Sequence, residues 1–140
     1  MSSPVASASA AKVLPERHRR GRRAENAATE HLLDEGFSIL GRNVRIGPLE
    51  IDIVARRGDL VVIAEVRARG ATSYEKPLAS ISRTKIRALM RAARGIWRGR
   101  LSKMRGVQRM RIDILAVTRD AAGNEKLEWI QGAITENDAR

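Results

Sequence analysis

Two neighbouring strand-like segments carry charged side chains at positions where a buried strand is normally apolar. The first runs from Leu49 to Val54 and the second from Val61 to Arg67. The four residues from Arg56 to Asp59 have the composition of a tight turn. The segments are also rich in β-branched residues, which favour extended backbone. We therefore predict a β-hairpin in this part of the chain.

Side-chain alternation sorts the residues of each predicted strand onto two faces. In the first strand, Leu49, Ile51 and Ile53 would share one face, and Glu50, Asp52 and Val54 the other. The second strand would place on one face Leu60, Val62, Ala64 and Val66, and on the other face Val61, Ile63, Glu65 and Arg67. The hairpin would then gather Glu50, Asp52, Glu65 and Arg67. Buried carboxylates are costly unless they bind something, so we expect a divalent metal beside a phosphate.

Length and composition favour one α/β domain. We expect a single domain at residues 17–135, a disordered tail at 1–16 and a flexible end at 136–140 of the 140-residue chain. Cysteine is absent, which excludes disulfides and thiolate metal sites. No apolar run is long enough to span a membrane, and the tail does not resemble a signal peptide. The cytoplasm is the expected location.

Positive charge is concentrated in one tract. The chain has a net charge of +11, and residues 83–111 contain eleven basic side chains and no acidic ones. A nucleic acid is the expected partner, with an anionic membrane surface or a merely solubilising face as alternatives. The only aromatic residues are Trp97, Trp129, Tyr74 and Phe37. This scarcity disfavours a stacking platform for single strands and favours backbone contact to a duplex or branched structure.

The remaining segments alternate between helical and extended patterns. We predict helices from Arg22 to Glu35 and from a Ser80 or Ser82 cap to Trp97, strands at 37–46, 110–117 and 126–131, and loops at 70–77 and 99–108. The order α-β-β-β-α-β-β indicates a mixed sheet flanked by helices. Basic residues predicted to contact nucleic acid lie on the second helix and the loop after it: Arg83, Arg87, Arg91, Arg94, Arg98, Arg100, Lys103 and Arg105. Lys85 lies on the other edge of the apolar helix face.

The hairpin carboxylates suit Mg²⁺ or Mn²⁺, because these ions prefer oxygen ligands and commonly take one or two carboxylates. Asp52 and Glu65 are the expected ligands, and Glu50 would reach a second ion or a water. A cation two residues after Glu65 would face the phosphate and the attacking water. This combination is what phosphodiester hydrolysis requires.

An acidic residue followed by Glu-x-Arg on a hairpin resembles the acidic-x(n)-Glu-x-Lys pattern of the PD-(D/E)xK nuclease superfamily. Further motifs occur in order: Gly21-x-x-Ala24-Glu25-x-x-Ala28, Asn43-x-Arg45, Glu50-Ile51-Asp52, Glu65-Val66-Arg67-x-Arg69, a loop with Tyr74, Ile81-x-x-x-Lys85 and Arg111-Ile112-Asp113-Ile114. Over residues 20–118 the chain resembles the UPF0102 (YraN-like) family, which is similar to archaeal Holliday-junction resolvases. The resemblance implies a restriction-endonuclease-like fold, a metal-dependent nuclease and a homodimer.

The same resemblance implies roles for individual residues. Asp52 and Glu65 would be metal ligands and Glu25 an accessory acid, while Lys85 matches a lysine of the family. Asp113 matches an acid of the family, and its alternation with apolar residues predicts a structural role. Glycines of the pattern are replaced by Ala24 and Leu49, and its catalytic lysine is replaced by Arg67.

The arginine at position 67 leaves two functions open. Arginine can clamp a phosphate with two hydrogen bonds, but it cannot act as a base near neutral pH. The chain could be an active nuclease, in which Lys85 substitutes if its side chain reaches the site. Alternatively, it could be a catalytically inactive nucleic-acid-binding module that keeps the fold.

Overall fold

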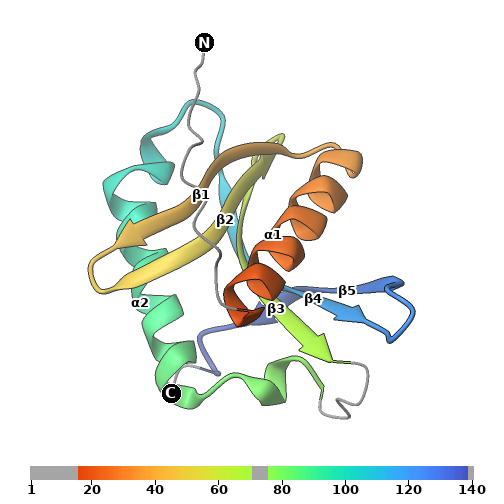
Figure 1. The fold of residues 1–140 in the computed structure, drawn as a ribbon. Coiled ribbons are helices and arrows are strands. Elements are labelled where there is room, and N and C mark those ends of the chain that lie inside the picture. Colours follow the sequence, from red (N-terminus) through yellow and green to blue (C-terminus); the bar gives the residue numbers. More distant parts are fainter. Residues whose placement is uncertain (1–15, 71–75, 139–140) are drawn as a thin grey trace, which may run out of the picture.

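Two helices flank a five-stranded sheet in the computed structural model, which describes residues 16–70 and 76–138 (Figure 1). The elements are α1 (Glu16–Asp34), β1 (Ser38–Ile46), β2 (Leu49–Arg57), β3 (Leu60–Gly70), α2 (Arg83–Gly99), β4 (Arg109–Arg119) and β5 (Glu125–Ile134). Single 3₁₀ turns, η1 (Leu78–Ser80) and η2 (Leu101–Lys103), precede and follow α2. The predicted order of helices and strands is confirmed.

The strands are arranged in the sheet in their chain order, β1-β2-β3-β4-β5. All neighbouring pairs are antiparallel except β3 and β4, which pair in parallel from Leu60↔Arg109 to Gly70↔Arg119. Parallel neighbours need a long crossover connection, and α2 lies in this one. The predicted mixed sheet is therefore confirmed, and the α/β arrangement is consistent with a restriction-endonuclease-like fold.

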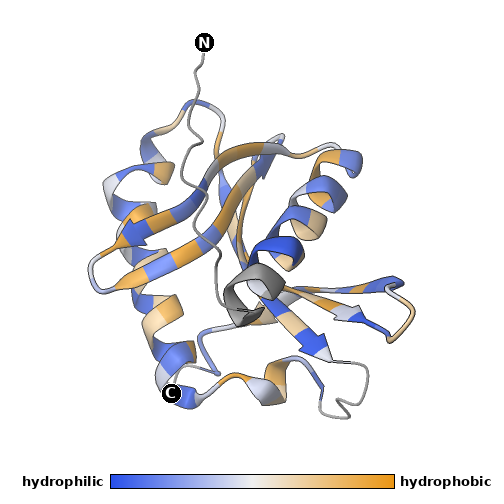
Figure 2. Ribbon diagram, viewed as in Figure 1, coloured by the Kyte–Doolittle hydropathy of each residue, from blue (hydrophilic) through white to orange (hydrophobic). Residues whose placement is uncertain are grey.

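Each face of the sheet packs against one helix. On the α2 side, Ile63 and Ile114 belong to the same buried cluster as Leu89. On the α1 side, Val62 and Leu115 cluster with Leu32. The faces predicted for β3 are confirmed, because its residues alternate between the two clusters along the strand. Apolar and hydrophilic residues also alternate along the β1–β2 hairpin in Figure 2.

The faces predicted for β2 are wrong at one point. Ile51 and Val54 both pack on the α2 side, whereas Ile53 packs on the α1 side. The hydrogen-bonded pairing of β2 with β3 ends at Ile53↔Ala64, and the outer part of the hairpin curls toward α2 (Figure 1). Strand alternation assumes a continuous sheet, and here the sheet opens beside Asp52. The irregularity therefore coincides with the predicted site.

Some predicted boundaries also differ. Helix α1 begins at Glu16 rather than Arg22, so it includes the last residue of the predicted tail, while residues 1–15 lie outside the described residues. The loop predicted at 99–108 contains η2, and its Leu101 and Val107 are buried. These apolar anchors tie the segment to the core. Tyr74 lies in the part of the loop that is outside the described residues.

Asp113 organises the β4–β5 edge of the sheet. Its carboxylate is fully buried and accepts hydrogen bonds from Arg111 Nε and Nη2 at 2.8 and 2.9 Å, Trp129 Nε1 at 2.8 Å and Gly132 N at 2.9 Å. The strand register shifts here, and Gly132 has φ +61°. The geometry agrees with the structural role that alternation along the strand predicted for Asp113. No described helix is long and apolar enough to cross a membrane.

Candidate metal and catalytic site

Asp52 and Glu65 come together where β2 separates from β3. One residue beyond the last pair, Ile53↔Ala64, the register places Asp52 opposite Glu65. Glu65 is only 3% exposed. The Val66 backbone N–H donates a hydrogen bond of 2.8 Å to Asp52 Oδ2, which fixes the Asp52 carboxylate against β3. The structure thus places the two predicted metal ligands side by side on adjacent strands.

Burial makes both carboxylates harder to ionise. Burial raises the pKa of Asp52 to about 7, and the charges of Glu65 and Glu25 add to the rise, while the Val66 N–H and Lys85 oppose it. Burial also raises the pKa of Glu65, against the opposing influence of Lys85 and Arg67. Two neighbouring acids that resist ionisation in this way are typical of functional sites.

One oxygen of Glu65 has no partner in the described part of the chain. Oε1 of this residue is buried and accepts no hydrogen bond there. Buried polar atoms are nearly always hydrogen-bonded, so an exception needs an explanation. A divalent cation bound by Asp52 and Glu65 would satisfy this oxygen and stabilise both ionised carboxylates. The donor set therefore fits an oxygen-preferring ion such as Mg²⁺ or Mn²⁺.

Lys85 reaches the carboxylate pair from α2. Its Nζ lies 3.6 Å from Glu65 Oε2. The helix start fixes this position, because the Lys85 backbone N–H donates a hydrogen bond of 3.1 Å to the N-cap Ser82 Oγ. The Ser82 cap was one of the two that the sequence predicted. The Lys85 side chain therefore reaches the site, which was the condition for it to substitute for the lysine that Arg67 replaces.

Arg67 is shared between the site and the turn before α2. Its Nη1 lies 3.9 Å from Glu65 Oε2, and its Nη2 donates a hydrogen bond of 3.1 Å to the Ser80 carbonyl. Ser80 ends η1, two residues before the cap of α2. Arg67 therefore links the end of β3 to the segment that positions Lys85.

Glu25 faces the same site from α1. Its Oε1 accepts a hydrogen bond of 3.2 Å from Asn43 Nδ2 and lies 3.6 Å from Arg42 Nη2. Asn43 has φ +51°, a left-handed conformation in which asparagine is enriched. Because Glu25 raises the pKa of Asp52, its charge acts on the carboxylate pair. The predicted accessory acid is thus held beside the site by β1.

Glu50 does not join the carboxylate pair. It is exposed and its register partner in the hairpin is Arg45. Among the residues that the structure describes, no three His, Cys, Asp or Glu side chains are grouped closely enough to hold a metal. The expected trio with Asp52 and Glu65 is therefore not formed. The pair that remains still matches the one or two carboxylates that Mg²⁺ commonly takes.

The predicted basic residues form a line that leads away from the site. Arg87, Arg91 and Arg98 are exposed on α2, whereas Arg94 forms an ion pair with Glu136. Arg100, Lys103 and Arg105 follow the end of α2, whose seventeen residues span about 25 Å. These three residues therefore lie at the end of α2 opposite to Lys85.

Several contacts that hold the site residues in place were not predicted, among them the hydrogen bond from the Val66 N–H to Asp52. Arg42 and Asn43 hold Glu25, and the Ser80 carbonyl holds Arg67. The asparagine in the β1 segment gave a weak signal, since this residue type tolerates positive φ. A backbone carbonyl leaves no signal in the sequence.

Comparisons with known proteins agree with the motif order. The model of the uncharacterised protein family UPF0102 matches residues 24–117. A UPF0102 protein of Sorangium cellulosum is 46% identical over 113 residues, which cover 81% of this chain and 78% of that protein. UPF0102 proteins of Alkalilimnicola ehrlichii and an Arthrobacter species are 41% and 38% identical, covering 82% and 80% of this chain and 86% and 92% of the relatives. The chain therefore belongs to the UPF0102 family.

Proposed function

We propose that this protein is a metal-dependent endonuclease that acts on branched or double-stranded nucleic acid, with DNA as the first candidate. The observation that carries the proposal is the buried Asp52–Glu65 pair, whose Glu65 Oε1 lacks a hydrogen-bond partner among the described residues and whose Oε2 faces Lys85. The cytoplasmic location and the homodimer expected from the sequence belong to the same proposal.

Asp52 and Glu65 would hold the cation. A bound Mg²⁺ or Mn²⁺ stabilises charge that develops on a phosphate and makes a nearby water more acidic. Glu25 adds negative charge beside the pair and is kept in place by Arg42 and Asn43. The acidic residues would therefore supply negative charge for the ion, and Lys85 and Arg67 would supply positive charge for the phosphate.

Lys85 and Arg67 would together take the place of the lysine that the superfamily pattern has at position 67. Lys85 is a primary amine 3.6 Å from Glu65 Oε2, so it can hold or release a proton near the attacking water. Arg67 is already bound to the Ser80 carbonyl through its guanidinium. We assign proton transfer or phosphate contact to Lys85, and positioning of the α2 start to Arg67.

The nucleic acid would be bound mainly through its phosphates. Arg87, Arg91 and Arg98 are exposed on α2, downstream of Lys85. Each phosphate neutralised by such a side chain releases counterions, which strengthens binding at low salt. The acid-free tract from residue 83 to 111 supports this assignment.

A second candidate function is nucleic-acid binding without cleavage. It is favoured by Arg67, which replaces the lysine of the superfamily pattern and cannot serve as a base. The same fold and basic surface would then act as a binding module.

The test is cleavage of a labelled four-way junction and a sequence-matched duplex in Mg²⁺ or Mn²⁺. We expect cutting by the wild type, and its loss in Asp52→Asn and Glu65→Gln, which keep the size of each side chain. Asp59→Asn removes an exposed carboxylate elsewhere and is the matched control.

Three other outcomes of these cleavage and binding measurements would each lead to a different conclusion. Cutting that appears only in Arg67→Lys would identify a nuclease disabled at one position. Absence of cutting in every variant, with salt-sensitive binding intact, would establish the binding module. Absence of both cutting and binding would refute the proposed function.

A further inference from the structure

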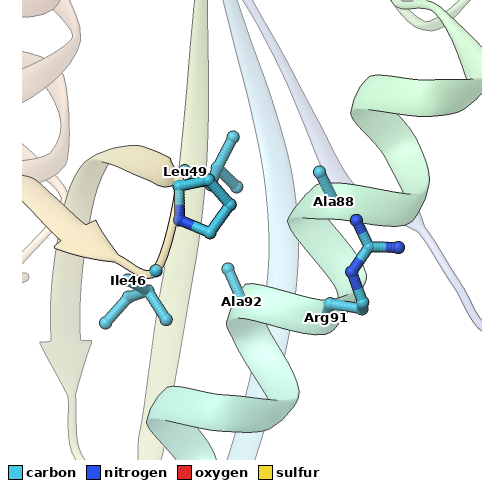
Figure 3. Close-up of a pocket in the computed structure, with 7 residues that line it drawn as sticks. Ile46, Leu49, Ala88, Arg91 and Ala92 are labelled. Carbon is cyan, nitrogen blue, oxygen red and sulfur yellow. The ribbon is translucent and has the colours of Figure 1, made fainter.

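A groove lies between the turn of the β1–β2 hairpin and α2 (Figure 3). It encloses about 210 Å³ and is lined by Ile46, Gly47, Pro48, Leu49, Ala88, Arg91 and Ala92. Six of these seven residues are apolar or glycine, and Arg91 supplies the single charge. The small side chains of Ala88 and Ala92 leave room where α2 faces the hairpin.

Both walls of the groove lead directly to the candidate site. On α2, Ala88 lies one turn beyond Lys85, about 4.5 Å along the helix axis. On β2, Leu49 precedes Asp52 by three residues, about 10 Å along the strand. The groove therefore lies about one helix turn from Lys85 and about 10 Å from Asp52, at the part of the hairpin that has separated from β3. A chain that passes through the site can continue into it.

The charges around the groove favour a polyanion. Arg91 lines it, and Arg87 and Arg98 are exposed on the same helix. The whole of α2 contains no acidic residue. The one acid of the hairpin tip, Glu50, is opposite Arg45 in the register. An acidic phosphate backbone is therefore attracted, while the aliphatic floor provides a surface for sugars and base edges.

The dimensions of the groove favour one strand over two. A hollow of about 210 Å³ is too small to take a duplex, whose major groove alone is about 12 Å wide, whereas part of a single strand can enter it. We infer that this groove binds an unpaired nucleic-acid strand that leaves the candidate site, so that the preferred substrate is a duplex with a single-stranded arm. This inference rests on the proposed function, because it assumes that nucleic acid occupies the site.

The test compares binding of a blunt duplex with binding of the same duplex carrying a 3′ or 5′ single-stranded arm. Fluorescence anisotropy in EDTA measures binding without cleavage, so catalysis does not enter the result. The wild type should bind an arm-bearing duplex more tightly. Ala88→Leu fills the groove with a good helix former and should bring the ratio of affinities close to one.

A charge variant tests the same groove without altering its volume. Arg91→Gln should lower the salt dependence of arm-bearing duplex binding, by about 0.7 in the log–log slope for one single-strand phosphate. Lys126→Gln, on the exposed part of β5, removes a charge elsewhere and should leave the slope unchanged. Because Arg91 is exposed, its replacement should not unfold the protein.

The outcomes separate this inference from the proposed function. Equal binding of both duplexes by the wild type, or a preference that survives Ala88→Leu, would overturn the inference and leave the nuclease proposal standing. A change in sedimentation of Ala88→Leu in place of a change in arm preference would make the groove an interface between copies, which also overturns it. If the wild type binds no nucleic acid, both proposals fail.

Discussion

The amine of Lys85 lies 3.6 Å from Oε2 of Glu65, although the two residues belong to different elements and are twenty positions apart. The superfamily pattern places its lysine on the same strand as the glutamate. In this chain that strand carries Arg67, and a lysine in the first turn of α2 lies near the glutamate instead. A cation is thus supplied to the same carboxylate from another direction.

Lys85→Met should abolish cleavage more completely than Arg67→Met. Loss of a positioned proton-transfer group typically lowers a rate by about 10²–10⁴-fold, whereas loss of Arg67 releases the Ser80 carbonyl and loosens the α2 start. Single-turnover cleavage of a labelled junction measures both rates, with Lys126→Met as the charge control. If Arg67→Met is the more damaging change, the division of roles that we assign is incorrect.

Asp52→Asn should stabilise the metal-free protein above neutral pH. The folded-state pKa of Asp52 is raised from 3.8 to about 7. Between these values the folded protein holds a proton that the unfolded chain has released, so stability falls as pH rises through this window and stays low above it. Asparagine removes this dependence and can still accept the Val66 N–H. Thermal unfolding in EDTA should therefore show a larger gain for the variant at pH 8 than at pH 5. An equal gain at both pH values would contradict the raised pKa.

Mn²⁺ should raise the melting temperature of the wild type at pH 8. A ligand present at a hundred times its dissociation constant stabilises the native state by about 2.7 kcal/mol. The shift should disappear in Glu65→Gln and persist in Asp59→Asn, whose carboxylate is 40% exposed at another part of the molecule. Differential scanning fluorimetry provides the measurement. A shift that Glu65→Gln retains would place the ion elsewhere.

Asp113→Ala should strongly destabilise the fold. The change leaves Arg111, Trp129 Nε1 and the Gly132 N–H without their acceptor, and removal of one member of a buried ion pair typically costs about 3–5 kcal/mol. Asp59→Ala breaks the exposed pair with Arg109 and should cost less than about 1 kcal/mol. Urea unfolding gives both values. Similar costs for the two variants would show that the buried network contributes little.

The sequence predicted those parts of the fold that depend on regular repetition. Alternation in β3 and the helical period of α2 placed Glu65 and the core residues correctly. The faces of Ile51 and Ile53 could not be predicted, because the curl of the hairpin is set by packing against α2 rather than by the strand itself. The helical period located Lys85 at an edge of the apolar face, but only the docked helix determines what that edge meets.

Contacts between residues that are far apart in the sequence likewise could not be predicted from local patterns. The pairing of Arg94 with Glu136 joins residues forty-two positions apart. This ion pair engages one of the arginines of α2 that were predicted to contact nucleic acid, and no local sequence pattern indicates it.

The chain order of the strands also bears on how the molecule assembles. Short turns join β1 to β2, β2 to β3 and β4 to β5, whereas β3 and β4 meet only after the chain has passed through α2. Local hairpins close in microseconds, and contacts between distant segments follow more slowly because more chain entropy is lost. Lys85 lies within the crossover. We therefore expect a folding chain to bring Asp52 and Glu65 together on their hairpin before Lys85 reaches them from α2.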